Sequence, residues 1–184
     1  MNTIKAIIIP GNGDDSPSDK WFPYVAEELE KLNVKSINVK FPDPILARKE
    51  YWLPFIKELG ADENTILIGH SSGAVAAMKY AQDNKILGSV LVGIYYTHLG
   101  DENEKKSGYF DDPWDWSTIK NNQKWIIEFS SLDDPYIPIE QPRYINKILS
   151  TEYYEYSDRK HFSEKNYIVF PELVEVIKKK LLDK

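Results

Sequence analysis

Short apolar runs alternate with longer amphipathic stretches along this chain. Six runs rich in β-branched and aromatic residues have the length of strands and cover residues 6–9, 36–41, 65–68, 89–92, 125–129 and 151–156. Between them, apolar residues recur at helical spacing, in the sets Val25, Leu29, Leu32; Ala74, Ala77, Met78, Ala81; and Leu173, Val174, Ile177, Leu181. Strands that alternate with helices predict βα units and a mainly parallel sheet with helices on both faces, which is a three-layer α/β/α sandwich.

A chain of 184 residues fits one well-buried domain and is short for two. Because no internal repeat or low-complexity linker marks a boundary, we predict a single α/β domain over residues 1–184. Residues 48–59 have a helical pattern, but Pro54 removes a backbone donor and predicts an irregular helix there.

Composition removes several classes of function. A net charge of −6 argues against a general nucleic-acid partner, which would require a clustered basic face. The hydrophobic and charged shares, 42% and 28%, are those of an ordinary soluble protein, and no apolar run approaches the roughly 20 residues that span a membrane. The absence of cysteine excludes disulfides and thiolate metal sites. Since the chain also starts without the features of a signal peptide, we expect a cytoplasmic protein with no membrane partner.

The strongest chemical signal is the pentapeptide GHSSG at residues 69–73. It matches the G-x-S-x-G nucleophile elbow and lies between the apolar run 65–68 and the small residues 74–77, the strand, turn and helix context that this motif requires. The glycines let strand and helix approach each other closely while the turn exposes the serine. The bare pattern also occurs as an ordinary glycine-rich turn, but its flanks favour Ser71 as a nucleophile.

A serine nucleophile needs a histidine base, and three histidines are available. His70 lies inside the turn, where its side chain should diverge from Ser71, and His98 lies in the loop after the next strand. His161 follows the last predicted strand, at the edge of the sheet where ligands bind in open α/β folds. Its place in the chain order Ser, Asp, His of α/β hydrolases favours His161 as the base.

The acid that orients this histidine should follow the predicted strand 125–129. Asp133 and Asp134 both lie in the turn there, and an Asp-Asp-Pro sequence also has a plain structural use as a turn. Spacing alone leaves the two aspartates as nearly equal candidates for the acceptor of the histidine Nδ1 proton.

The oxyanion hole of such enzymes uses the amide after the nucleophile and a second amide from the loop after an early strand. These donors are predicted to be Ser72 and Asn12, the latter preceded by Gly11, whose backbone can approach a substrate closely. A Gly-rich turn before a helix can also bind phosphate. The spacings of phosphate-binding motifs are absent, however, and Asp14 and Asp15 would repel an anion.

Several separated segments resemble the small serine hydrolases related to retinoblastoma-binding protein nine. They are residues 8–13, 42–44, 52–55, 68–74, 99–104, 107–110, 113–114, 133–135 and 161–162, which together span nearly the whole chain. The resemblance implies a minimal α/β-hydrolase fold with a six-stranded parallel sheet and no separate cap domain. It assigns Ser71, Asp134 and His161 as the catalytic residues. It also implies esterase or aminopeptidase-like activity, including hydrolysis of amino-acid esters.

The chain departs from this family at two places. The partner motif Leu-x-Cys-x-Glu aligns with residues 59–63, where Ala61 replaces the cysteine, so binding to the retinoblastoma protein is not carried over. Lys160 stands where related hydrolases often have a glycine before the histidine, which changes the loop shape or adds positive charge near the site.

The combined interpretation is a serine hydrolase that cleaves a small-molecule ester or amide through an acyl-enzyme, with no metal and no cofactor. The long irregular segment 95–116 follows the strand after the serine, and this position lets it overhang the site. Its Tyr109 and Trp114 either form an apolar substrate pocket or pack the loop onto the body. The rival functions are a catalytically weak interaction module with a hydrolase shape and a flavodoxin-like nucleotide binder, which the acidic first loop disfavours.

Overall fold

The computed structural model describes residues 3–182, so the first two and last two residues of the predicted domain 1–184 lie outside it. One six-stranded sheet forms its centre, and every pair of neighbouring strands is parallel. The strands are β1 (Lys5–Ile9), β2 (Lys35–Asn38), β3 (Thr65–His70), β4 (Gly88–Val92), β5 (Ile126–Ser131) and β6 (Glu152–Tyr156), in the spatial order β2-β1-β3-β4-β5-β6. The winding reverses between β1 and β3, which is where open α/β sheets form their ligand crevice.

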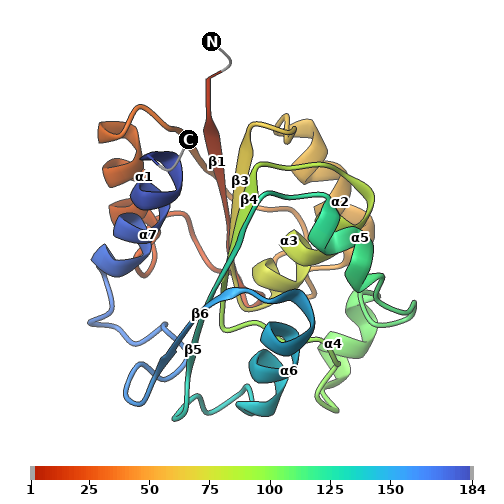
Figure 1. Cartoon of the computed structure of the whole chain (residues 1–184). Coiled ribbons are helices and arrows are strands. Elements are labelled where there is room, and N and C mark those ends of the chain that lie inside the picture. Colours follow the sequence, from red (N-terminus) through yellow and green to blue (C-terminus); the bar gives the residue numbers. More distant parts are fainter. Residues whose placement is uncertain (1–2, 183–184) are drawn as a thin grey trace.

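Helices cover both faces of the sheet (Figure 1). One face carries α1 (Phe22–Lys31) and α7 (Pro171–Leu182), whereas α2 (Lys49–Glu58), α3 (Ser72–Asp83), α5 (Trp116–Asn121) and α6 (Glu140–Leu149) cover the other. The short α4 (Glu102–Ser107) lies toward the carboxyl ends of the strands. The prediction of a three-layer α/β/α domain with six parallel strands is confirmed.

Each central strand divides its side chains between the two helical layers. In β1, Ala6 and Ile8 belong to the core on the side of α1 and α7, whereas Ile7 and Ile9 belong to the core on the side of α2 and α3. All four side chains are at most 1% exposed. A strand buried on both faces has an unbroken apolar sequence, which is why the apolar runs located the strands.

The structure shows the course of two segments that were predicted to be irregular. α2 continues through Pro54 as one helix of 10 residues, so no new helix starts at the proline. Pro54 has no backbone donor to contribute to this helix. The segment 95–116 is not irregular throughout, because it contains α4 and ends at the first residue of α5. Asp101 is the N-cap of α4, since its carboxylate accepts hydrogen bonds from the amides of Asn103 and Glu104.

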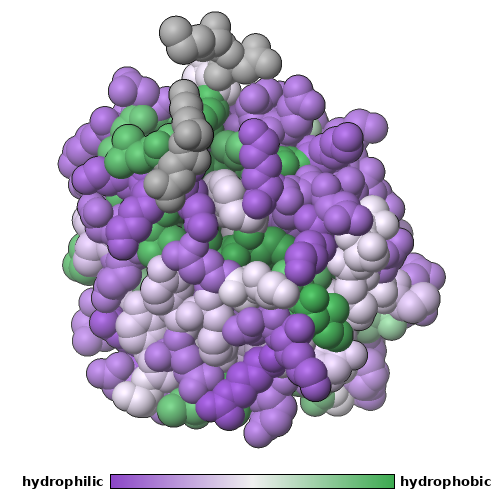
Figure 2. All heavy atoms as spheres, viewed as in Figure 1, coloured by the Kyte–Doolittle hydropathy of each residue, from purple (hydrophilic) through white to green (hydrophobic). Residues whose placement is uncertain are grey.

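Figure 2 shows that the face of the molecule seen in Figure 1 is mainly hydrophilic, with its hydrophobic residues in separate patches. Scattered apolar surface of this kind is normal in folded proteins. Among residues 3–182, no helix combines the length and the apolar character required to cross a membrane.

Candidate active site

Ser71 lies on the turn between β3 and α3. Its φ and ψ angles are 54° and −121°, a strained conformation for a residue that carries a Cβ. Its amide donates to the carbonyl of Val92 on β4 at 2.8 Å, and its carbonyl accepts the amides of Ala74 and Val75 in the first turn of α3. The neighbouring strand and the helix therefore hold the strained turn in place.

Contact distances explain the two glycines of this turn. A Cβ on Gly69 would lie 2.3 Å from the carbonyl oxygen of Gly73, and a Cβ on Gly73 would lie 2.3 Å from the carbonyl oxygens of Ile9 and Pro10. Real Cβ atoms do not approach backbone this closely, so β1, β3 and α3 meet only because both positions lack a side chain. The steric argument made from the sequence is confirmed at both glycines.

His161 lies in the loop after β6, and Asp134 lies in the turn after β5. The Nδ1 atom of His161 is 2.7 Å from Asp134 Oδ2. The second oxygen of Asp134 accepts the amides of Tyr136 and Ile137 at 2.8 and 3.0 Å, so both carboxylate oxygens are engaged. The side chains of His161 and Asp134 are only 9% and 3% exposed. This contact fixes the orientation of the imidazole and favours the tautomer with its proton on Nδ1.

Asp133 has different partners from its neighbour. Its Oδ1 accepts hydrogen bonds from Ser131 Oγ at 2.6 Å and from the amide of Lys160 at 2.8 Å. Lys160 has a φ of 47°, a left-handed conformation at the position where related hydrolases often have glycine. Asp133 thus supports the backbone that presents His161, while Asp134 contacts the ring. The geometry distinguishes two aspartates that spacing had left equal.

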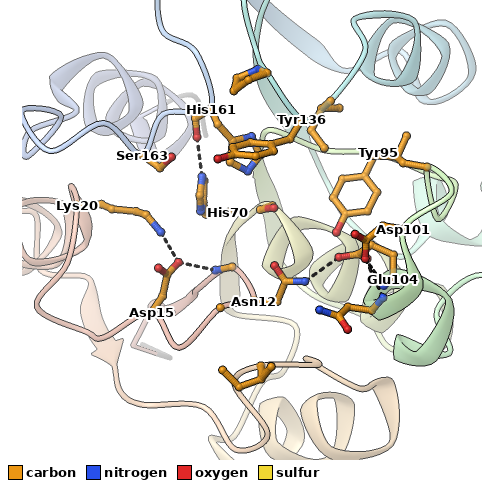
Figure 3. A pocket seen from close by; sticks show the side chains of 18 of the residues that line it. Asn12, Asp15, Lys20, His70, Tyr95, Asp101, Glu104, Tyr136, His161 and Ser163 are labelled. Atoms are coloured by element: carbon orange, nitrogen blue, oxygen red, sulfur yellow. Dashed lines mark hydrogen bonds and ion pairs between the residues drawn. The ribbon is translucent and has the colours of Figure 1, made fainter.

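The His70 side chain is directed to the loop that carries His161. Its Nε2 lies 2.8 Å from the carbonyl oxygen of His161, and since a carbonyl can only accept, Nε2 carries the proton (Figure 3). Burial, followed by the proximity of His161, lowers the pKa of His70 well below its usual value, so the ring is neutral. This contact agrees with the prediction that His70 diverges from Ser71.

The predicted oxyanion donors are the backbone amides of Asn12 and Ser72. Among residues 3–182, neither amide donates a hydrogen bond, so both can bind a substrate oxygen. Asn12 follows β1 in a loop whose preceding amide, that of Gly11, is held by Asp15 Oδ2 at 3.2 Å. Ser72 is the first residue of α3 and adjoins Ser71.

A buried polar cluster around Glu104 connects the two predicted donors, and Figure 3 shows its contact with Asn12. Oε1 of Glu104 accepts hydrogen bonds from Asn12 Nδ2 at 2.8 Å and from Ser72 Oγ at 3.3 Å. The Ser72 hydroxyl also lies 3.0 Å from the hydroxyl of Tyr95. Glu104 is 7% exposed, and burial raises the pKa of its carboxyl.

A cavity of 740 Å³ opens beside these residues, a volume typical of small-molecule sites. Ser71, His161, Asn12 and Gly11 all line it, which brings four predicted site residues together. The apolar residues that line the cavity include Ile45, Leu99, Pro135, Tyr136 and Ile137. The charged ones are Asp15, Lys20, Asp101 and Glu104. Asp134 and Ser72 do not line the cavity, but the first contacts His161 and the second adjoins Ser71.

The family of the chain follows from two comparisons with known proteins. A family model described as serine hydrolase matches residues 6–179. The chain is also 44% identical over 180 residues to serine hydrolase RBBP9 of Rattus norvegicus, in an alignment that covers 96% of this chain and 95% of that protein. The chain belongs to the serine hydrolase family. Within the α/β-hydrolase superfamily it is RBBP9-like, as the resemblance of its segments implied.

Solved structures share the fold of this serine hydrolase at lower sequence identity. The ydeN gene product of B. subtilis is similar with a TM-score of 0.88 at 22% identity, over 98% of this chain and 100% of that chain. Est1E of Butyrivibrio proteoclasticus, solved with ferulic acid bound, is similar with a TM-score of 0.74 at 14% identity, over 98% of this chain and 88% of that chain. These similarities concern the fold alone.

Two aromatic residues that were predicted for the substrate pocket lie elsewhere in this serine hydrolase. Tyr109 is fully buried, and neither Tyr109 nor Trp114 is among the residues that line the cavity. Trp114 stacks on Trp116 with ring centroids 5.5 Å apart and covers the ammonium of Lys79 at 4.7 Å. Of the two roles that the sequence left open, these contacts favour the one in which the rings pack the 95–116 segment onto the body.

Two other residues of the serine hydrolase site were not assigned a role from the sequence. Tyr136 is 67% exposed at the cavity, and its ring packs edge-on against His161 with centroids 5.1 Å apart. The second residue is Glu104. It follows Asp101 by three residues, and an acidic residue at this distance from a helix N-cap is the one signal for it in the sequence. Nothing in the sequence signals Tyr136, because its contact depends on how the turn after β5 is folded.

Proposed function

We propose that this serine hydrolase cleaves small esters or amides with Ser71 as the nucleophile, His161 as the general base and Asp134 as the acid that orients the base. The observation that carries this proposal is the 2.7 Å contact between His161 Nδ1 and Asp134 Oδ2, beside the cavity that Ser71 lines. In residues 3–182 no hydrogen bond joins Ser71 Oγ to His161. Such catalytic contacts often tighten only when substrate binds.

The proposed reaction has two halves. His161 Nε2 takes the proton of Ser71 Oγ as that oxygen attacks the carbonyl carbon, and the electron pair of the carbonyl moves to its oxygen. The amides of Asn12 and Ser72 stabilise this oxyanion. Collapse expels the alcohol or amine, which receives the proton from His161, and leaves the acyl group on Ser71. Water then attacks the acyl-enzyme with His161 again as base, which releases the acid and restores the serine.

The charges of the cavity favour an aminoacyl substrate within this class. Lys20 forms an ion pair with Asp15, and it is the one lysine or arginine among the described residues that line the cavity. Asp101 therefore remains as an exposed negative charge that attracts an ammonium group. Ile45 and Tyr136 offer apolar surface nearby. An amino group beside a hydrophobic side chain is the chemistry of an aminoacyl ester or amide.

The test compares hydrolysis of aminoacyl esters, short acyl esters and aminoacyl amides by the parent protein and by Ser71→Ala. We expect turnover to fall by roughly 10⁴- to 10⁶-fold in the variant, and labelling by a fluorophosphonate probe to be lost. Ser157→Ala changes an exposed serine after β6 and is the matched control, which should keep both signals. Undiminished labelling of Ser71→Ala would refute the assignment of the nucleophile.

The same panel tests the substrate class. Faster hydrolysis of aminoacyl esters than of acyl esters of equal length supports the aminoacyl preference. Equal rates would remove that preference and leave the serine mechanism intact. A parent protein that hydrolyses none of the panel and reacts with no probe would favour an interaction module with a hydrolase fold.

A further inference from the structure

We propose that Glu104 is a positioning residue that fixes the two oxyanion-hole amides relative to each other. The inference rests on the proposed function, because Asn12 and Ser72 are the donors of that reaction. Glu104 itself need not touch the substrate. Its carboxyl acts through the two residues whose backbone does.

One oxygen of Glu104 contacts both donor residues. Oε1 lies 2.8 Å from Asn12 Nδ2 and 3.3 Å from Ser72 Oγ, and Figure 3 shows the Asn12 side chain directed to this carboxyl. Asn12 belongs to the loop after β1, whereas Ser72 begins α3. The distance between their amides is therefore not fixed by one secondary-structure element, and the shared acceptor supplies a connection between the two segments.

The backbone of Glu104 is itself held at both of its polar groups. Its amide donates to Asp101 Oδ1 at 3.0 Å, and its carbonyl accepts the hydroxyl of Ser107 at 2.7 Å. The side chain is also largely buried, at 7% exposure. A carboxyl whose backbone and surroundings are fixed can hold its partners in place, because little conformational freedom remains to be lost.

The raised pKa of the Glu104 carboxyl lessens the negative charge that it would place beside the oxyanion hole. A full negative charge there would oppose the charge that develops in the tetrahedral intermediate. Burial is the largest influence on the pKa of Glu104 and raises it, while the nearby polar side chains of Tyr95, Ser72 and Asn12 lower it in part. The net direction of the pKa is upward, so the ionised form is less favoured here than in water, and Oε1 accepts both hydrogen bonds in either form.

The other oxygen of Glu104 separates this role from direct substrate binding. Oε2 is buried and has no hydrogen-bond partner in the described part of the chain. A substrate ammonium therefore does not reach it without displacing the surrounding residues. Oε1 is already occupied by its two partners, so the carboxyl acts through Asn12 and Ser72.

The experiment measures kcat and KM for an ester substrate in the parent, Glu104→Met, Glu104→Gln and Glu102→Met. Methionine keeps the length of the side chain and removes the acceptor, whereas glutamine keeps a carbonyl oxygen at the same place. Glu102 is on the same helix, where it pairs with Lys105 and is 74% exposed, so Glu102→Met is the matched control. The affinity for a boronic acid, which forms a tetrahedral adduct with an active serine, is measured in parallel.

We expect Glu104→Met to lower kcat by about 10- to 100-fold, with KM changed less than about twofold. The boronic acid affinity should fall together with kcat, and Glu104→Gln should recover most of the loss. A smaller folded fraction would also lower kcat at unchanged KM, but it would leave the boronic acid affinity of the folded protein unchanged, so this affinity distinguishes the two cases. Equal kcat in Glu104→Met and the parent would overturn the proposal, as would a loss that glutamine fails to rescue.

A second variant covers the case in which Glu104→Met does not fold. Asn12→Ala removes the other end of the 2.8 Å contact and keeps the backbone amide of residue 12. It should lower kcat in the same way, and an unchanged kcat would overturn the positioning role. Activity that depends on Ser71 but not on Glu104 refutes this inference alone, whereas activity that is independent of Ser71 refutes the proposed function.

Discussion

Replacement of Glu128 by glutamine should remove a pH-dependent loss of stability from this protein. Glu128 lies within β5, opposite Leu91 of β4 and Tyr153 of β6, and none of its side chain is exposed. Thr151 Oγ1 donates to its Oε2 at 2.9 Å, while Oε1 has no partner among residues 3–182. Burial raises the pKa of Glu128 from 4.5 to about 8, and the bond from Thr151 offsets only part of this rise.

The magnitude follows from the difference in proton affinity between the folded and unfolded states. A pKa of about 8 against 4.5 corresponds to about 5 kcal/mol once the carboxyl is fully ionised, at about 1.4 kcal/mol for each tenfold change in affinity. The folded state binds the proton more tightly, so the contribution of Glu128 to stability is fully present below about pH 4.5 and is lost as the pH rises toward about 8. Between about pH 5 and about pH 8, the parent should lose roughly 3 to 4 kcal/mol through this group.

Urea unfolding, followed by the fluorescence of the 5 tryptophans, measures the effect. The difference in the free energy of unfolding between Glu128→Gln and the parent cancels the other titrating groups. We expect this difference to grow in favour of the variant by roughly 3 to 4 kcal/mol from about pH 5 to about pH 8.

Glu155→Gln is the matched control on the neighbouring strand. The hydrogen bond from Arg143 lowers the pKa of Glu155, so the contribution of this group to stability changes with pH only below about pH 4.5. Its difference from the parent should therefore stay constant over the range in which Glu128→Gln changes. Parallel curves for Glu128→Gln and the parent would refute the reasoning from burial.

Three substitutions test the surroundings of the proposed base. Asp134→Asn should lower kcat for ester hydrolysis by about 10³- to 10⁴-fold, because an amide favours the wrong histidine tautomer. Asp133→Asn should lower kcat less and the thermal midpoint more, since its oxygen holds the amide of Lys160; the same kcat in both variants would contradict these separate roles. His70→Phe should lower kcat by about tenfold, because the carbonyl of His161 loses its donor. In urea unfolding the unpaired carbonyl should cost about 1 to 3 kcal/mol, and a fully active and stable His70→Phe would contradict this support.

The sheet could be predicted because most of its strands are buried on both faces. Each of the six apolar runs contains most of one strand, but the bounds differ where buried residues are polar or small. β3 continues through Gly69 and His70, and β5 continues through Ser130 and Ser131, all of which are buried. A pattern of apolar residues cannot detect such positions. β2 is shorter than predicted and ends at Asn38.

The site could be predicted as far as its chemistry is local. The small residues on both sides of Ser71 predicted the close packing of its turn. The chain order Ser, Asp, His predicted His161 as the base. The choice between Asp133 and Asp134 could not be made from spacing, because only the loop of His161, 27 residues beyond Asp134, distinguishes them. The place of Trp114 was also open, since an aromatic ring has the same apolar character in a core as in a pocket.

The proposed nucleophile follows a central strand of the sheet, whereas the proposed base follows an edge strand. Ser71 follows β3, which is paired on both sides by β1 and β4, whereas His161 follows β6, which pairs only with β5 at the edge of the sheet. The side chains of β6 are mostly half-buried, and local opening begins where backbone and side chains are least covered. Fraying of this edge would withdraw the proton acceptor while the central strands stay paired. The contacts of His161 with Asp134 and His70 therefore hold the loop after β6 against residues that belong to β3 and follow β5.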